Sequence, residues 1–357
     1  MNSHGFGVNF LCLLAAVLLG AGPVAADVTI EETLRVEGTG LMSMMNMSGT
    51  SVTRISGERA RADMDLQMDS RMMRMVGQLG PTAEIIRLGE ERVISLDLKK
   101  KTYSETSFAA QRAEMEEAMA QMRDSQRAQQ QGMSGIDESE CDWSEATASV
   151  ERSGETSTIG GYRAERLVLA AKQSCGNPES GEVCDFGLRL EQWIAPEFEA
   201  GPEVLRFYQA YAEKMGLDAT GSRGFAERAE TMFGGYEGIW QALAEHMLSL
   251  DGYPVKSSIS LAIGGLECES VKQLDAAGSG APALGEAIGG ALGGRLGGML
   301  GRKRDDSGKA KVDAPESVPA DGMLTIMTIS NELVSVSRAP IGAETFEVPA
   351  GFRAVSR

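Results

Sequence analysis

Apolar and polar residues alternate along several short stretches of the chain. In residues 61–69, Ala62, Met64, Leu66 and Met68 alternate with arginine, aspartate and glutamine. A period of two places apolar side chains on one face of a strand and charged ones on the other, as in an antiparallel sheet with one solvated face. The pattern therefore predicts a strand here, with methionines on its apolar face.

Other stretches predict further strands. Residues 84–88 and 92–98 flank Gly-Glu-Glu and indicate a β-hairpin. Comparable alternation or short apolar runs predict strands at residues 28–36, 162–170, 186–194, 255–263, 324–329 and 333–336, the last two forming a hairpin around Asn331.

The period changes to that of a helix in two regions. Within residues 108–131, Met115, Met119 and Met122 recur at i, i+4 and i+7, which predicts an amphipathic helix with a methionine stripe. Residues 202–250 predict a second helical block, with a break at its glycines. Because strands and helices are segregated along the chain, we expect an α+β fold in which the methionine-striped helix covers the sheet.

The amino-terminal region predicts the compartment. Residues 10–20 form an unbroken apolar run, and small residues 24–26 precede Asp27. A segment this short is typical of a cleaved secretory signal peptide over residues 1–26, and too short for a membrane span. We therefore expect a secreted, periplasmic protein.

Charge narrows the classes of partner. The net charge of −17 lies wholly beyond residue 26, since the first 26 residues contain no Asp, Glu, Lys or Arg. An acidic protein repels nucleic acid and anionic lipid surfaces. We therefore expect no nucleic-acid partner.

Four cysteines follow the predicted signal peptide: Cys141, Cys175, Cys184 and Cys268. An even number in an oxidising compartment predicts two disulfides, for which three pairings exist. The turn-rich residues between Cys175 and Cys184 favour that pair, which leaves Cys141 with Cys268. A metal site is the alternative, but the sequence has no CxxC motif or neighbouring histidine to support it.

A glycine ladder lies at residues 285–301, within a glycine-rich insertion and linker at 276–321. The residues of the ladder and of the basic cluster after it are Gly285, Gly289, Gly293, Gly297, Gly301, Arg302, Lys303 and Arg304. On a helix this repeat gives a bare face that packs closely against a membrane, a second copy or the rest of the chain, and the basic cluster suits lipid head groups. The alternative is a low-complexity insertion, because each interior glycine costs a helix about 1 kcal/mol relative to alanine.

Six short motifs are informative together. They are the alternating residues 61–65, the hairpin 85–97 with the Lys-Lys-Lys-Thr-Tyr after it, Gly161-Tyr162, the strand containing Trp193, Gly-Tyr-Pro-Val at 252–255 and Pro-Ala-Gly-Phe at 349–352. On these motifs the chain resembles a bacterial domain family of unknown function that is similar to the periplasmic lipoprotein carriers LolA and LolB.

The resemblance implies a strongly curved antiparallel β-sheet, a half-barrel, covered by helices around an apolar cavity that shelters acyl chains in the carriers. No carrier site residue aligns with this chain. The expected organisation is a signal peptide at 1–26, a carrier-like domain at 27–275 with helical segments at 108–131 and 202–250, a glycine-rich insertion and linker at 276–321, and strands at 322–357 that complete the sheet.

Methionine-rich faces supply the candidate binding site. The residues expected to line the cavity are Met64, Leu66, Met68, Met115, Met119 and Met122. Flexible thioethers adapt to varied apolar ligands, although stripes at structural periods also arise from ordinary core packing. Methionines 42–47 offer a copper site as a further alternative, but no histidine or cysteine lies near them.

Catalytic patterns are weak. His246 is the one histidine after the predicted signal peptide, and the sequence has no GxSxG motif or phosphate-binding loop. We therefore expect a protein without catalytic activity, metal or cofactor that binds a lipid or lipidated partner in an apolar cavity. The alternative is a structural or interaction protein of the envelope that acts through residues 285–301, by peripheral membrane contact or self-association.

Overall fold

The computed structural model describes residues 27–70, 80–128, 142–178, 180–216, 239, 252–268 and 322–355. The predicted signal peptide (1–26) and glycine-rich insertion (276–321) lie outside these residues, as does most of 217–250.

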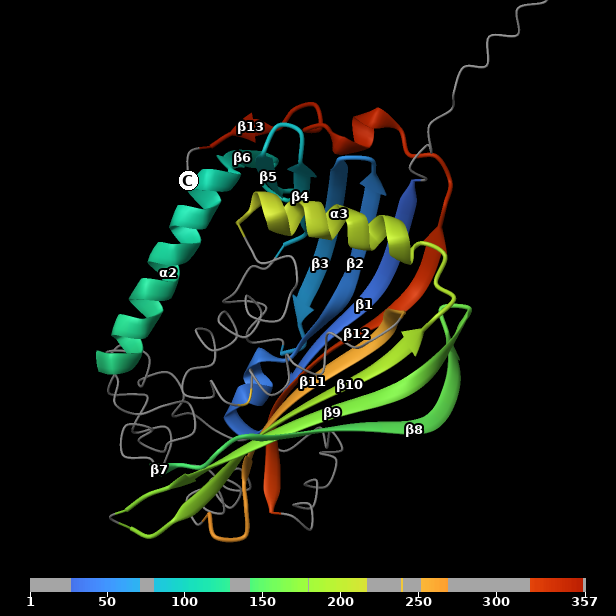
Figure 1. Ribbon diagram of the computed structural model, residues 1–357. Helices are drawn as coiled ribbons and strands as arrows, with labels where there is room; N and C mark the ends of the chain where they lie inside the picture. The colour runs from blue at the N-terminus through green and yellow to red at the C-terminus, as the bar shows by residue number, and fades with distance from the viewer. Residues whose placement is uncertain are drawn as a thin grey trace, which may run out of the picture.

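One sheet of thirteen strands forms the body of the described structure (Figure 1). Its order is β13-β6-β5-β4-β3-β2-β1-β12-β11-β10-β9-β7, and β8 also pairs with β9. All pairs are antiparallel except β13 with β6. The strands are β1 Val28–Gly38, β2 Met47–Ser56, β3 Arg59–Met68, β4 Thr82–Arg87, β5 Arg92–Asp97, β6 Thr102–Ser107, β7 Asp142–Trp143, β8 Thr147–Ile159, β9 Tyr162–Gly176, β10 Val183–Ala195, β11 Tyr253–Gly264, β12 Met323–Ser337 and β13 Arg353–Ala354.

Two α-helices lie in the described part of the chain: α2 (Phe108–Ala128) and α3 (Gly201–Lys214). The backbone N–H of Ala110 donates to Ser107 Oγ at 3.2 Å, so Ser107 caps the start of α2. Pro202 occupies the first turn of α3. Two short 3₁₀ helices, η1 (Gly40–Met45) and η3 (Ala343–Phe346), complete the elements.

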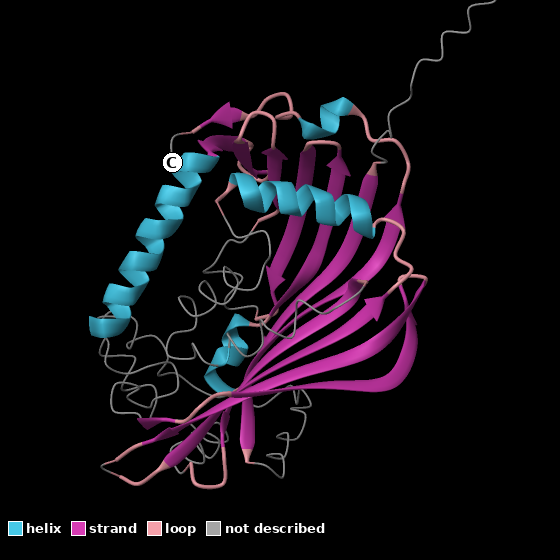
Figure 2. Cartoon of the chain, viewed as in Figure 1, coloured by secondary structure: helices cyan, strands magenta, loops and turns pink. Residues whose placement is uncertain are grey.

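The expected α+β half-barrel covered by helices is wrong. The sheet is large, open and mixed, and α3 crosses only part of one face while α2 runs along the side of the molecule (Figures 1 and 2). Among the side chains that the structure describes on α2, Phe108 is buried, while Glu114, Glu116 and Glu117 beside Met115 are exposed. The described part of this helix therefore lacks the wide apolar face that a covering helix needs.

The largest apolar core lies between α3 and the face of the sheet beneath it, called the inner face below. One register row on this face contains Val28, Ile55, Ala60, Ile86 and Val93, each directly opposite the next. All five side chains are buried, and Val204 and Phe207 of α3 belong to the same cluster. The alternating residues of β1 to β5 thus place one apolar row under the helix.

The opposite face of β4 and β5 is also covered. Phe346 is fully buried against Ile85, Ile94 and Leu96, and the carboxy-terminal residues 341–352 pack over the same strands. Strands covered on both faces carry near-continuous apolar runs, which explains the composition of β4 and β5.

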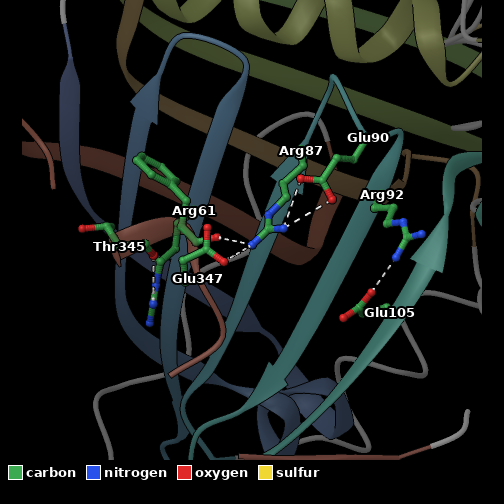
Figure 3. Close-up of polar contacts among 8 residues, drawn as sticks. Arg61, Arg87, Glu90, Arg92, Glu105, Thr345 and Glu347 are labelled. Carbon is green, nitrogen blue, oxygen red and sulfur yellow. Dashed lines mark hydrogen bonds and ion pairs between the residues drawn. The ribbon is translucent and has the colours of Figure 1, made fainter. Parts of the chain in front are cut away.

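Arginines fasten this carboxy-terminal segment (Figure 3). Arg61 Nη1 donates to the Thr345 carbonyl at 3.2 Å, and Arg87 Nη2 donates to the Phe346 carbonyl at 3.0 Å and to Glu347. These cations satisfy carbonyl groups at the end of η3.

The predicted hairpin around Asn331 is a continuous strand instead. β12 runs through Asn331 and pairs with β1 on one side and β11 on the other. Asn331 Nδ2 donates to Glu32 Oε1 at 2.9 Å. Pairing on both sides therefore overrides the preference of asparagine for turns.

The predicted disulfide pairing is also wrong. The turn after β9 does place Cys175 directly opposite Cys184, but Cys184 is bonded to Cys268, with a Cα–Cα distance of 4.7 Å. β11 lies beside β10, and the chain turns at its end, so Cys268 reaches Cys184. Cys175 is itself disulfide-bonded, and Cys141 lies outside the described residues.

Candidate functional site

A continuous apolar row crosses the inner face next to the core under α3. Eight adjacent strands each contribute one side chain that lies directly opposite the next in the register. From β3 to β8 they are Met68, Met47, Val36, Ile329, Ile259, Leu190, Leu169 and Val150. Since strands lie about 4.8 Å apart, the row is about 34 Å long.

Burial changes along this apolar row. Leu190 and Leu169 are 3% and 0% exposed, and they belong to a buried cluster that includes Ile239. Ile329 is 39% exposed, while Met47 and Met68 are half-buried. The row is therefore covered over β9 and β10 and partly exposed over β12, β1, β2 and β3, which are called its open part below.

The open part of the row has the length of a lipid tail. It spans four strands, so three inter-strand spacings give about 14 Å. The hydrocarbon core of a bilayer is about 30 Å thick, and one acyl chain fills about half of it. Leu34 and Leu66 lie on the same face two residues from Val36 and Met68, and they widen the apolar surface.

The structure brings together half of the predicted site. Met64, Leu66 and Met68 lie on the inner face of β3, and Met64 is 39% exposed. Met115 is half-buried on α2, and Figure 1 shows this helix apart from β3, so Met115 does not join the methionines of β3 as expected. The side chains of Met119 and Met122 lie outside the description.

Sequence reasoning missed the neighbours of these methionines. The open row also contains Met47 of β2, Val36 of β1 and Ile329 of β12, because these three strands pair side by side. Ile329 is far from the other two residues in the chain. Alternation within β1 and β12 signals which face each residue takes but not which residues meet. Methionines 42–47, considered for copper, divide between η1 and β2.

Other predicted site residues cannot be placed. They are Gly285, Gly289, Gly293, Gly297, Gly301, Arg302, Lys303, Arg304 and His246, which all lie outside the described residues.

A polar cluster borders the open row on the side of α3. Half-buried Glu32 accepts a hydrogen bond from Asn331 Nδ2 at 2.9 Å, and Tyr208 shares a side-chain hydrogen bond with Thr53. Burial raises the pKa of Glu32 above its usual range, and the bond from Asn331 offsets part of this rise. The pKa values of Tyr208 and Tyr253 are also raised, mainly by burial and secondly by the negative charge of Glu32. These groups therefore lie within electrostatic range of one another.

Gln192 extends this polar cluster along the sheet. It lies opposite Ser257, which lies opposite Asn331, so the three side chains share the inner face. Gln192 is 8% exposed, and its buried Oε1 receives no hydrogen bond from the residues that the structure describes. A buried acceptor of this kind costs about 1–3 kcal/mol until a donor reaches it.

The outer face offers a row of cations, but they are engaged. Arg87 contacts Glu90 and the carboxy-terminal segment, and Arg92 pairs with Glu105 at 2.9 Å (Figure 3). These arginines hold the structure together and do not form an anion-binding site.

One group of potential metal ligands comprises Glu182, Cys184 and Cys268. The sulfur atoms of Cys184 and Cys268 are bonded to each other, so neither is a thiolate. The group therefore carries no argument for a metal.

No protein-family model matches the sequence, and no curated protein matches it significantly. The resemblance to the lipoprotein carriers therefore rests on the motifs quoted above. None of the helices in the described ranges is both long and apolar enough to cross a membrane.

Proposed function

We propose that this is a secreted, periplasmic protein without catalytic activity that binds the acyl chain of a lipid or lipidated partner. The observation that supports the proposal is the apolar row across β3, β2, β1 and β12, which is partly exposed to solvent and matches an acyl chain in length. A contiguous apolar surface that stays partly exposed is typical of an interaction site.

Burial of methylene groups would supply the affinity. Each sheltered methylene contributes about 0.8 kcal/mol, so a dodecyl chain gains about 9 kcal/mol, from which an association cost of at least about 4 kcal/mol is subtracted. The remainder of about 5 kcal/mol corresponds to a dissociation constant somewhat below 1 mM. Native lipids with longer or paired chains would bind more tightly for the same reason.

Chain-length dependence tests the proposal. Residues 27–357 are titrated with octanol, decanol and dodecanol in a calorimeter, and lipid extracts of the native protein are examined by mass spectrometry. We expect the affinity to rise roughly tenfold or more for each pair of added methylenes, because each contributes about 0.8 kcal/mol. Native protein that carries no lipid, together with alkanol affinities that do not depend on length, would refute acyl-chain binding.

A matched pair of variants on one strand locates the site. Ile329→Ser removes an apolar side chain from the open row, and we expect dodecanol binding to weaken by about fivefold to tenfold. Val334 lies on the same strand and is 47% exposed, but it lies outside the row. Val334→Ser should leave binding unchanged, and an equal effect of both substitutions would contradict the assignment of the site to the inner face.

A further inference from the structure

Methionine supplies half of the open part of the apolar row. Met68 of β3 and Met47 of β2 lie directly opposite each other, next to Val36 of β1 and Ile329 of β12. Both methionine side chains are half-buried, so solvent reaches part of each one. Two of the four side chains that a bound tail would contact are therefore thioethers, which are readily oxidised, unlike the hydrocarbon side chains beside them.

Oxidation changes the polarity of a thioether. The sulfur is oxidised by two electrons when it takes one oxygen from hydrogen peroxide, the O–O bond breaks and water leaves. The sulfoxide that forms is a polar side chain with an oxygen that accepts hydrogen bonds. All side chains of the row are hydrocarbons or thioethers, so none of them can donate a hydrogen bond to this oxygen.

A sulfoxide in the row opposes tail binding far more than it opposes folding. Because Met47 and Met68 are only half-buried, water can still hydrate their sulfoxide oxygens in the folded protein. A tail that lies along the row excludes this water and leaves each oxygen without a donor, which is energetically unfavourable. The affinity for a tail is therefore the property that oxidation changes most.

We propose that Met47 and Met68 form a modification site, at which oxidation by a peroxide releases the bound tail. The inference rests on the acyl-chain function proposed above and adds its regulation. The secreted location proposed above lacks the reducing buffer of the cytosol. Reduction by a methionine sulfoxide reductase, in which a dithiol becomes a disulfide and water leaves, restores both thioethers and with them the apolar row.

Binding before and after oxidation tests the proposal. Residues 27–357 are treated with hydrogen peroxide, freed of it, and titrated with dodecylphosphocholine below its micellar concentration. We expect the dissociation constant to rise at least about tenfold, because each acceptor loses its water without gaining a donor, and to recover after treatment with the reductase. Peptide mass spectrometry should find sulfoxide at residues 47 and 68 but little at Met215, which is 3% exposed.

Conservative variants assign the effect to the row. The double variant Met47→Leu, Met68→Leu keeps the row apolar but removes both sulfur atoms, so it should bind the tail and no longer respond to peroxide. Met115→Leu is the matched control, because Met115 is also half-buried but lies on α2, apart from β3 (Figure 1). This control should stay as sensitive to peroxide as the native protein. The double variant Met47→Gln, Met68→Gln imitates the polar sulfoxides and should weaken binding about tenfold without peroxide.

The outcomes separate the two proposals. If the untreated protein does not bind dodecylphosphocholine, the proposed function itself fails. If it binds but peroxide leaves the affinity unchanged, or if the leucine double variant loses affinity on oxidation as the native protein does, the acyl-chain function stands and the modification site is refuted. Oxidised protein that has lost its cooperative urea transition would assign the loss of binding to unfolding, which also refutes the modification site.

Discussion

Truncation of Phe346 tests how the carboxy-terminal segment stabilises the sheet. The ring is 0% exposed and packs against Ile85, Ile94 and Leu96 on the outer face. The guanidinium of Arg59 lies 4.9 Å from the ring centroid. Phe346→Ala therefore removes both the apolar contacts and the cation–π contact, while the backbone carbonyl keeps its bond from Arg87.

The magnitude follows from these contacts. Truncation of a buried phenylalanine to alanine costs about 3–5 kcal/mol, because the contacts are lost and a cavity remains. Loss of the contact with half-buried Arg59 adds about 0.5–1 kcal/mol. We expect the free energy of unfolding to fall by about 5 kcal/mol, which shifts the urea midpoint by about 1.7 M if the slope is about 3 kcal/mol/M.

Two measurements check the prediction. Urea unfolding followed by circular dichroism reports the global change, and hydrogen exchange reports local detachment of the segment. The amide of Arg353, which donates to the Lys101 carbonyl just before β6 at 3.0 Å, and that of Val355, which donates to the Tyr103 carbonyl in β6 at 2.8 Å, should lose protection. Val334→Ala, at an exposed site, serves as the control and should change stability by less than about 0.5 kcal/mol. If Phe346→Ala alters neither the midpoint nor the exchange of these amides, the segment does not pack on the sheet in solution.

Four further predictions concern the disulfide and the titrating groups. Replacement of both Cys184 and Cys268 by serine should lower the free energy of unfolding by about 2–4 kcal/mol in non-reducing urea titrations, because the bond closes a loop of 84 residues; an unchanged midpoint would contradict this. Glu32 has a raised pKa when folded, so it reduces stability as the pH rises above its unfolded pKa, and Glu32→Gln should stabilise the protein at pH 7 relative to pH 4. Glu203 is the opposite case, because its hydrogen bond with Arg338 lowers its pKa and contributes stability that is lost on acidification. Glu203→Gln should therefore destabilise the protein at pH 7 relative to pH 4. Urea denaturation of both variants at pH 7 and pH 4 checks this, and a change in stability of the same sign for Glu32→Gln and Glu203→Gln would contradict the reasoning. Burial and the nearby carboxylate of Glu84 raise the pKa of Tyr211 to about 12. An alkaline titration followed by ultraviolet absorbance should therefore lose a tyrosine ionisation step near pH 12 in the Tyr211→Phe variant. Loss of a step near pH 10 instead would refute the assignment.

Local patterns determined much of the secondary structure. The alternation around Met64 predicted β3 and its apolar face, and the runs beside the turn at residues 89–91 predicted the hairpin of β4 and β5. These elements follow from side-chain period and turn composition, which neighbouring residues set by themselves. The sequence did not predict β2 or β8, because β2 is rich in small polar residues and β8 is almost wholly exposed. Backbone pairing with neighbouring strands, and not an alternation of apolar and polar residues, makes these two segments strands.

Only the tertiary structure decided which strands meet, and with them the site. The sequence placed Met68 on an apolar face, but the register of β3, β2, β1 and β12 alone puts Met47, Val36 and Ile329 in line with it. The same non-local pairing set Cys184 beside Cys268 and left α3, not α2, over the sheet. The physical reason is that strand pairing depends on backbone hydrogen bonds between distant segments, for which the local order of side chains carries no unique code.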